Sequence, residues 1–265
     1  MPEVTKCPQC GQNAVHRIDF DTSVGLVTIH ACLECAHTGD APWKQDPTFR
    51  GSVTRLVESL VMARPTKEDR VAFYHALMTQ IHWNWQRYSK LPPGPARARI
   101  LHAEIDKVVA KDGSSEVSCQ KGCAACCYQI VAMNDDEADL LAEHVISGRV
   151  AIDIPRLKRQ IGPSASDEHW NNPALVKHAD RRCVFLGADN TCQVYEDRPA
   201  ACRKYFVRTD PVLCDLETNP HGKVQSMCIN QAEVLTSAAY NLRINAMGFL
   251  PRQLWARLKK LKGKK

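Results

Sequence analysis

The stretch CQKGCAACC, residues 119–127, decides how this chain folds, because it places four cysteines in nine positions. Thiols at this density can form disulfides, carry out redox chemistry or bind metal. The chain contains 13 cysteines, and this odd number argues against a complete set of disulfides. The first residues, MPEVTKCPQC, contain no apolar signal-peptide segment, so we expect a cytoplasmic protein whose thiols stay reduced. Metal or redox chemistry is therefore the better interpretation of the cluster.

The composition narrows the choice of partners. No run of about 18 apolar residues occurs, which predicts that no segment spans a membrane. The last nine residues, RLKKLKGKK, carry six basic groups, and the net charge of the whole chain is +6. Without these six, the 35 basic residues become 29, equal to the 29 acidic residues. A basic surface over the whole protein is thus not indicated, and only the tail is a weak candidate for contact with nucleic acid.

Two further cysteine pairs occupy the N-terminal region. Cys7 and Cys10 form one C-x2-C pair, and after 21 residues Cys32 and Cys35 form another. Four thiolates brought together in this way suit tetrahedral zinc, and the residues between them alternate as in a short hairpin. About forty residues bury too little surface to fold alone, so zinc would contribute folding energy. We predict a small zinc ribbon at residues 1–41; the alternatives are two redox dithiols or a reduced ribbon without metal.

Most of the remaining chain has the periodicity of helices. Thr66 with Asp69 resembles a capping box, the sequence LPPGP at 91–95 ends the helix that follows, and Asn134 is placed to cap another. The predicted helices cover residues 53–61, 66–88, 96–110, 134–146, 232–247 and 251–261.

Nine cysteines lie outside the N-terminal region. They are Cys119, Cys123, Cys126, Cys127, Cys183, Cys192, Cys202, Cys214 and Cys228. Because a tetrahedral site takes four ligands, nine thiols suffice for two sites with one left over, or for one site with the rest packed or redox-active. On a helix, Cys119, Cys123 and Cys126 would share one face. The adjacent Cys126 and Cys127 would have difficulty closing on one ion, so they would go to different partners or bridge two metals.

The motifs that follow the cluster make the pattern specific. CVFL at 183–186, CQVY at 192–195 and RPAACR at 198–203 follow the run in order. Over about residues 115–235, the combination resembles the YkgJ-type cysteine-cluster family, which is described as a zinc- or iron-chelating domain. A further downstream cysteine is usual in that family, and Cys228 or Cys214 fits that position. The usual glycine before the third motif is replaced here by Asn190-Thr191, and Asn can adopt the same left-handed turn.

The resemblance implies a metal centre. Thiolate-only sites suit zinc and iron–sulfur clusters about equally, and the crowded run leans toward iron. Arg198 and Arg203, beside Cys202, would offset the negative charge of such a site, or Arg198 would pair with Glu196 or Asp197. Flagellin lysine N-methylases carry a related cluster, but this chain has no glycine-rich loop after a strand that would bind S-adenosylmethionine.

Together these patterns predict a mainly α fold with irregular metal-stabilised loops and a small β zinc ribbon at the N-terminus. The expected divisions are the ribbon (1–41), a helical segment (42–114), a cysteine-cluster domain (115–235) and C-terminal helices with a basic tail (236–265). The predicted metal ligands are Cys7, Cys10, Cys32, Cys35, Cys119, Cys123, Cys126, Cys127, Cys183, Cys192, Cys202 and Cys228. The expected cofactors are zinc in the ribbon and zinc, iron or an iron–sulfur cluster in the central site.

The function that fits best is a metal-binding cysteine-cluster protein whose cofactor is structural or regulatory. The first alternative is a cluster-dependent enzyme that modifies a protein, such as a lysine N-methylase. The second is a zinc-ribbon adaptor associated with nucleic acid. The sequence leaves open whether the protein is an enzyme; the expected partners are metal ions and a protein partner or substrate.

Overall fold

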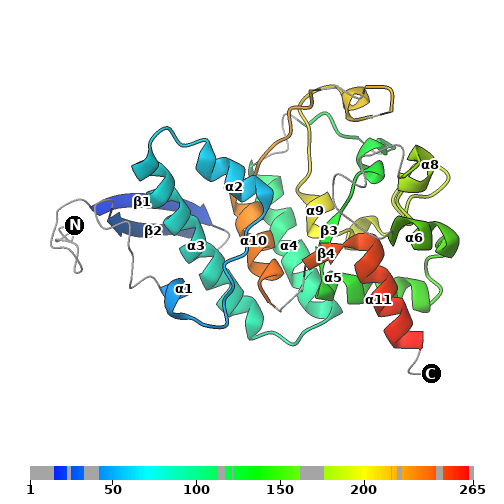
Figure 1. Ribbon diagram of the computed structural model, residues 1–265, viewed down its shortest axis with the longest axis horizontal. Helices are drawn as coiled ribbons and strands as arrows, with labels where there is room; N and C mark the ends of the chain where they lie inside the picture. The colour runs from blue at the N-terminus through cyan, green and yellow to red at the C-terminus, as the bar shows by residue number, and fades with distance from the viewer. Residues whose placement is uncertain are drawn as a thin grey trace. The chain divides into compact units, whose positions relative to one another are not determined.

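The computed structural model describes residues 15–22, 25–32, 42–112, 117–120, 122–161, 176–215, 217–219, 223–242 and 247–262. This part of the chain is mainly helical, as the sequence predicts (Figure 1). It divides into two compact units, each assembled from separate stretches of sequence. The first takes residues 1–91 and 230–244, and the second takes 92–229 and 245–265. Among the described helices, none combines the length and hydropathy that crossing a bilayer requires.

The N-terminal strands form a hairpin between the two C-x2-C pairs. β1 (Val15–Thr22) and β2 (Gly25–Cys32) are antiparallel, and their register places Val15 opposite Cys32. Of the four ligands predicted for the zinc of the N-terminal ribbon, only Cys32 is described, and only its backbone. The ligands outside the described residues are Cys7, Cys10 and Cys35. The zinc ribbon therefore stays a prediction.

Threonine caps start two helices of the first unit, which also contains the short α1 (Pro42–Gln45). α2 (Arg55–Met62) follows Thr54, whose hydroxyl accepts a hydrogen bond from the Val57 N–H at 3.2 Å. α3 (Lys67–Ser89) follows Thr66, whose hydroxyl accepts from the Asp69 N–H at 3.0 Å. Each cap satisfies one of the backbone donors that a helix start leaves free, which is why these helices begin where they do.

α10 (Asn230–Tyr240) packs against α2 and α3 and is buried from residue 231 to residue 240. Its buried Glu233 carboxylate accepts from the Thr54 hydroxyl at 2.8 Å. The sequence predicted a helix to residue 247, but the helix ends at Tyr240 and Met247 begins a strand of the second unit. The predicted end is therefore wrong.

Four longer helices build the second unit. They are α4 (Pro95–Asp112), α5 (Asp135–Ile146), α6 (Ile154–Ile161) and α11 (Leu250–Lys262). The predicted cap of α5 is confirmed as a complete capping box: the Asn134 side chain accepts from the Glu137 N–H, and the Glu137 carboxylate accepts from the Asn134 N–H, both at 2.9 Å. β3 (Ala132–Asn134) pairs antiparallel with β4 (Met247–Phe249). This pairing joins the residues before α5 to those before α11.

Short elements and irregular loops carry most of the central cysteines, in line with the predicted irregular loops. The short elements are η2 (Ala125–Tyr128), α8 (His178–Arg181), η3 (Tyr195–Asp197), α9 (Ala200–Arg203) and η4 (Pro211–Cys214).

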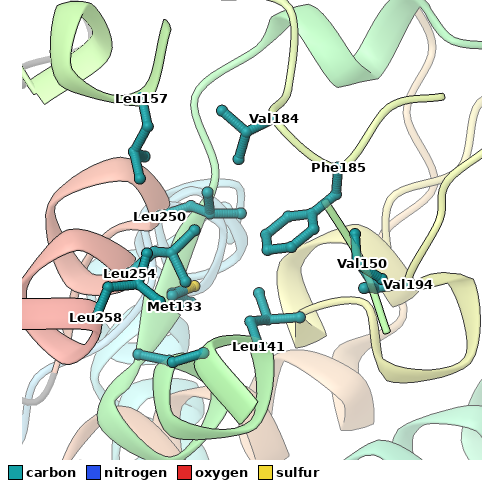
Figure 2. Close-up of a cluster of buried hydrophobic side chains, with 12 residues drawn as sticks. Met133, Leu141, Val150, Leu157, Val184, Phe185, Val194, Leu250, Leu254 and Leu258 are labelled. Atoms are coloured by element: carbon teal, nitrogen blue, oxygen red, sulfur yellow. The ribbon is translucent and has the colours of Figure 1, made fainter. Parts of the chain in front are cut away.

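An apolar core supports these loops (Figure 2). Phe185, from the CVFL motif, is buried among side chains that include Leu141 of α5 and Leu250 of α11. Cys183 and Cys192 are half-buried and pack against the same core. The apolar residues of the cysteine motifs therefore fix the loop that holds these two thiols.

Candidate metal centre

The cysteine run at 119–127 is not a continuous helix. Residues 117–120 have no regular structure, and only η2 forms a single 3-10 turn. Gly122 has φ +88°, a conformation that residues with a side chain rarely adopt, so the chain turns between Cys119 and Cys123. The shared helix face considered for the first three cysteines of the run is therefore not formed.

Backbone hydrogen bonds hold the cysteine-bearing segments side by side. The Cys183 N–H donates to the Cys127 carbonyl at 2.8 Å, which joins the second motif to the run. The Ser118 N–H donates to the Val207 carbonyl at 2.9 Å, and the Met227 N–H donates to the Phe206 carbonyl at 2.8 Å. Four stretches that are far apart in the sequence thus meet in one region of the second unit.

A tight loop over residues 186–193 positions Cys192. The Gly187 N–H donates to the Thr191 carbonyl at 2.8 Å, and the Gln193 N–H donates back to the Phe185 carbonyl at 2.9 Å. Asn190 has φ +58°, so it adopts the left-handed conformation that its place in the motif predicts. The replacement of the usual glycine is thus accommodated.

Cys183, Cys192 and Cys202, the first thiol group, interact with one another. Burial, followed by the charges of Cys192 and Cys126, raises the pKa of the Cys183 thiol to about 12. Burial also raises the pKa of Cys202 well above its ordinary value, and the charges of Cys183, Cys126 and Cys192 add to this effect. Burial raises the pKa of Cys192, while the nearby Arg198 opposes the increase. These thiols hold their protons strongly because their charges would be desolvated and would repel one another.

Cys119, Cys123 and Cys214 form the second thiol group. Burial raises the pKa of Cys123, and the charges of Cys126 and Cys119 raise it further. Burial likewise raises the pKa of Cys214, with contributions from Cys123, Cys119 and Cys126. Cys214 ends η4, which lies beside η2. The sequence left Cys214 as an alternative to Cys228, and the structure brings Cys214 to the run.

Cys126 interacts with both groups. The residue is exposed, and a hydrogen bond with the Cys127 thiol, followed by burial of the Cys126 thiol, raises its pKa. A negative charge on Cys126 would raise the pKa of members of both the first and the second thiol group. The other two cysteines are half-buried. The Cys127 carbonyl accepts a hydrogen bond from the Cys183 N–H. Cys228 comes directly after Met227, whose N–H donates to the Phe206 carbonyl.

Polar side chains of α4 and α5 hold the segment 195–203, which contains Cys202. Asp197 Oδ2 lies 2.7 Å from His144 Nε2 and the Asp197 carboxylate lies 3.6 Å from Arg99. Asp106 accepts from Arg203 at 2.5 Å. Arg99 and Asp106 are seven residues apart on α4 and thus lie on the same side of the helix. We call these contacts, together with that of Glu137 described next, the 195–203 clamp.

Glu137 is the most buried carboxylate of the clamp. Its Oε1 accepts from the Ala200 N–H, the first donor of α9, at 2.6 Å and lies 3.1 Å from His102 Nε2. The exposed fractions of the Glu137 and His102 side chains are 1% and 2%. Because Glu137 also caps α5, it connects the start of α5 to the helix that carries Cys202. The sequence predicted only the cap by Asn134, and neither role of Glu137 was anticipated.

The two arginines expected beside the centre have different surroundings. Arg198 acts as a positive charge on Cys192 and Cys126, as predicted, and its guanidinium lies 3.9 Å from the Tyr195 ring centroid. Arg203 is buried and donates to Asp106 and to the carbonyls of Arg198 and Glu196. Arg198 therefore offsets charge at the centre, whereas Arg203 holds the backbone of the loop.

The donor set fits a thiophilic metal. Soft and borderline ions such as zinc and iron prefer thiolates, and binding displaces the thiol protons. In the parts of the chain that the structure describes, no three His, Cys, Asp or Glu side chains lie at the spacing of a formed metal site. The neighbouring thiols therefore have suitable chemistry, and binding an ion would require them to move closer together.

Comparison with known proteins also associates this region with metal binding. Residues 118–229 match the model of the CxxCxxCC family, "Putative zinc- or iron-chelating domain". The match covers both thiol groups and Cys228, and it is consistent with the resemblance seen in the sequence motifs. No curated protein and no solved structure matches the chain.

Proposed function

We propose that the protein binds metal through the two thiol groups and that the ion has a structural or regulatory role. The observation that carries this proposal is the gathering of six cysteines from separate segments around Cys126, in a region that matches a zinc- or iron-chelating family. Burial first, and the charges of neighbouring thiolates second, raise the pKa of Cys123, Cys183, Cys192, Cys202 and Cys214, and a bound cation would offset both effects.

The proposed ligands follow from this arrangement. Each thiol group supplies three sulfurs, and Cys126 is close enough to act on both. Cys126 is thus placed to complete either group or to serve both, while Cys127 and Cys228 remain candidates from the sequence. Zinc would hold the loops together, whereas an iron–sulfur cluster would add electron transfer. The N-terminal ribbon would hold its own zinc through Cys7, Cys10, Cys32 and Cys35, in a cytoplasmic protein.

Metal analysis and an absorption spectrum test the proposal on protein purified without oxygen. A brown protein with iron and acid-labile sulfide would assign an iron–sulfur centre to the thiol groups, and a colourless protein with zinc would assign a structural centre. A protein that holds neither metal after anaerobic purification, and takes up neither on reconstitution, would refute the proposal.

Serine variants test which thiols act together. In protein reconstituted with Co²⁺, whose thiolate complexes absorb visibly, Cys183→Ser and Cys214→Ser should each remove part of the thiolate–cobalt absorption. Cys126→Ser should remove more than either, because Cys126 interacts with both groups. Cys7→Ser should lose only the ribbon metal. Equal loss in all four variants would contradict separate ribbon and central sites.

A further inference from the structure

Two neighbouring helices of the second unit carry many basic residues and no acidic ones. α6 has three basic residues and α11 has five. The helices lie next to each other (Figure 1), and Arg252 Nε donates to the Ile161 carbonyl at 3.3 Å. This pair of helices therefore gathers many basic residues in one part of the second unit.

The apolar sides of both helices are already used by the core. Leu250, Leu254 and Leu258 of α11 are buried in the same cluster as Leu157 of α6 (Figure 2). Three other α11 residues, Arg252, Trp255 and Lys259, lie on one stripe at helical spacing. Arg252 and Lys259 are exposed, Trp255 is half-buried with one side packed against the core, and Lys158 of α6 is also exposed. We call these four residues the α6–α11 basic face.

Neighbouring carboxylates are paired with arginines, not with the lysines of this face. Asp153 pairs with Arg156 at 3.4 Å and Asp180 pairs with Arg159 at 2.8 Å. Asp135 and Asp139 both pair with Arg257, at 2.6 Å and 3.2 Å. Within the described residues, no carboxylate forms an ion pair with Lys158 or Lys259.

Both lysines instead lie over the same aromatic ring. Lys158 Nζ lies 5.3 Å and Lys259 Nζ lies 6.0 Å from the Trp255 ring centroid. Cations next to a partly exposed aromatic ring match the two parts of a single-stranded nucleic acid, since lysines attract phosphates and an aromatic ring stacks on a base. α11 is about 20 Å long, enough to follow several consecutive phosphates.

We propose that the α6–α11 basic face binds single-stranded nucleic acid. A membrane surface fits less well, because an interfacial helix inserts an apolar side that α6 and α11 bury in the core. The proposal is independent of the metal, since none of its four residues belongs to the thiol groups or to the 195–203 clamp. A regulatory metal centre and a nucleic-acid surface would then occur in the same unit.

Fluorescence anisotropy of the full-length protein with a labelled oligothymidylate of about 15 nucleotides tests the proposal. The variant Lys158→Glu/Lys259→Glu should bind at least about tenfold more weakly, because two phosphate contacts become repulsive. The matched control is Lys107→Glu/Lys223→Glu, which reverses two exposed lysines of the same unit outside the face. The control should stay within about twofold of the unaltered protein, and the slope of log affinity against log salt should flatten by about 1.4 only in the first variant.

Three results would overturn the proposal. They are no binding by the unaltered protein, equal weakening in both double variants, or a preference for anionic phospholipid vesicles with the same dependence on Lys158 and Lys259. The variant Trp255→Leu, checked for folding by its thermal melting, tests the stacking part. It should weaken binding by at least about fivefold without changing the salt slope. Unchanged affinity in this variant would remove Trp255 from the proposed surface.

Discussion

Glu137 carries out two structural tasks with one carboxylate. One oxygen accepts from the Asn134 N–H and completes the cap of α5, while the other accepts from the Ala200 N–H and lies beside His102. The side chain is almost fully buried, so each oxygen depends on these partners and not on water. Glu137 is therefore a positioning residue for α9 and for Cys202.

Replacing Glu137 by Gln should destabilise the second unit by about 2 kcal/mol, because the amide NH2 meets a backbone donor where a carboxylate oxygen accepted before. We also expect weaker retention of metal, measured as the loss of thiolate–cobalt absorption during titration with a chelator. Denaturant unfolding gives the stability. Glu143→Gln is the control, since Glu143 lies on the same helix with 46% of its side chain exposed. If both variants retain metal equally well, Glu137 has no positioning role.

The lowered pKa of Asp197 should make the free energy of unfolding depend on pH. Burial would raise its pKa, but the hydrogen bond with His144 and the charge of Arg99 hold the pKa below the ordinary value of 3.8. A carboxyl with a lowered folded-state pKa stabilises the fold above pH 3.8, and this contribution is lost as the pH falls through the folded-state pKa.

The variant Asp197→Asn should thus be less stable than the unaltered protein by about 2 kcal/mol at pH 7, since it loses charged hydrogen bonds. The difference should narrow as the pH falls below 3.8. Urea unfolding at several pH values measures it. A difference that stays constant down to pH 3 would show that the Asp197 charge does not contribute.

At the scale of elements, the loop 186–193 shows how a short motif holds a thiol. Phe185 and Val194, on either side of the loop, are buried in the core, and the turn at Asn190 brings the chain back so that Cys192 lies near Cys183. The loop depends on one residue with positive φ, because the turn must close within a few residues.

Substitutions at Asn190 should separate conformation from chemistry. Asn190→Gly should leave stability within about 0.5 kcal/mol, since glycine adopts φ +58° freely. Asn190→Val should cost about 1–2 kcal/mol or more, because a branched side chain is strained in that conformation. Thermal unfolding of both variants measures the difference. Equal melting temperatures would mean that the turn does not constrain the loop.

At the scale of the whole molecule, the proposed metal should stabilise one region selectively. We expect that chelation under reducing, anaerobic conditions increases amide hydrogen exchange in residues 117–128 and 183–208, where backbone bonds hold the cysteine segments together. α3 and α10 should exchange as before, because their buried contacts belong to the first unit. Exchange that rises equally in all described helices, or nowhere, would contradict a metal that acts on these loops.

Local sequence patterns determined where helices begin and which cysteine motifs the chain carries. Thr66 and Asn134 start helices through bonds that reach only three residues along the chain, so the sequence alone predicts α3 and α5. The cysteine motifs resemble those of a family described as zinc- or iron-chelating, and residues 118–229 match such a family. Each of these features depends on residues that are near one another in the sequence.

Only the tertiary structure decided which distant groups meet. Cys214 lies near Cys123, Glu137 holds Ala200 and Arg203 is bound by Asp106, and no local spacing encodes any of these pairs. The end of α10 at Tyr240, with Met247 in a strand, likewise differs from the periodicity of the sequence. The physical reason is that packing and burial depend on the neighbours that folding brings together, whereas caps, turns and motif spacing depend on the chain within a few residues.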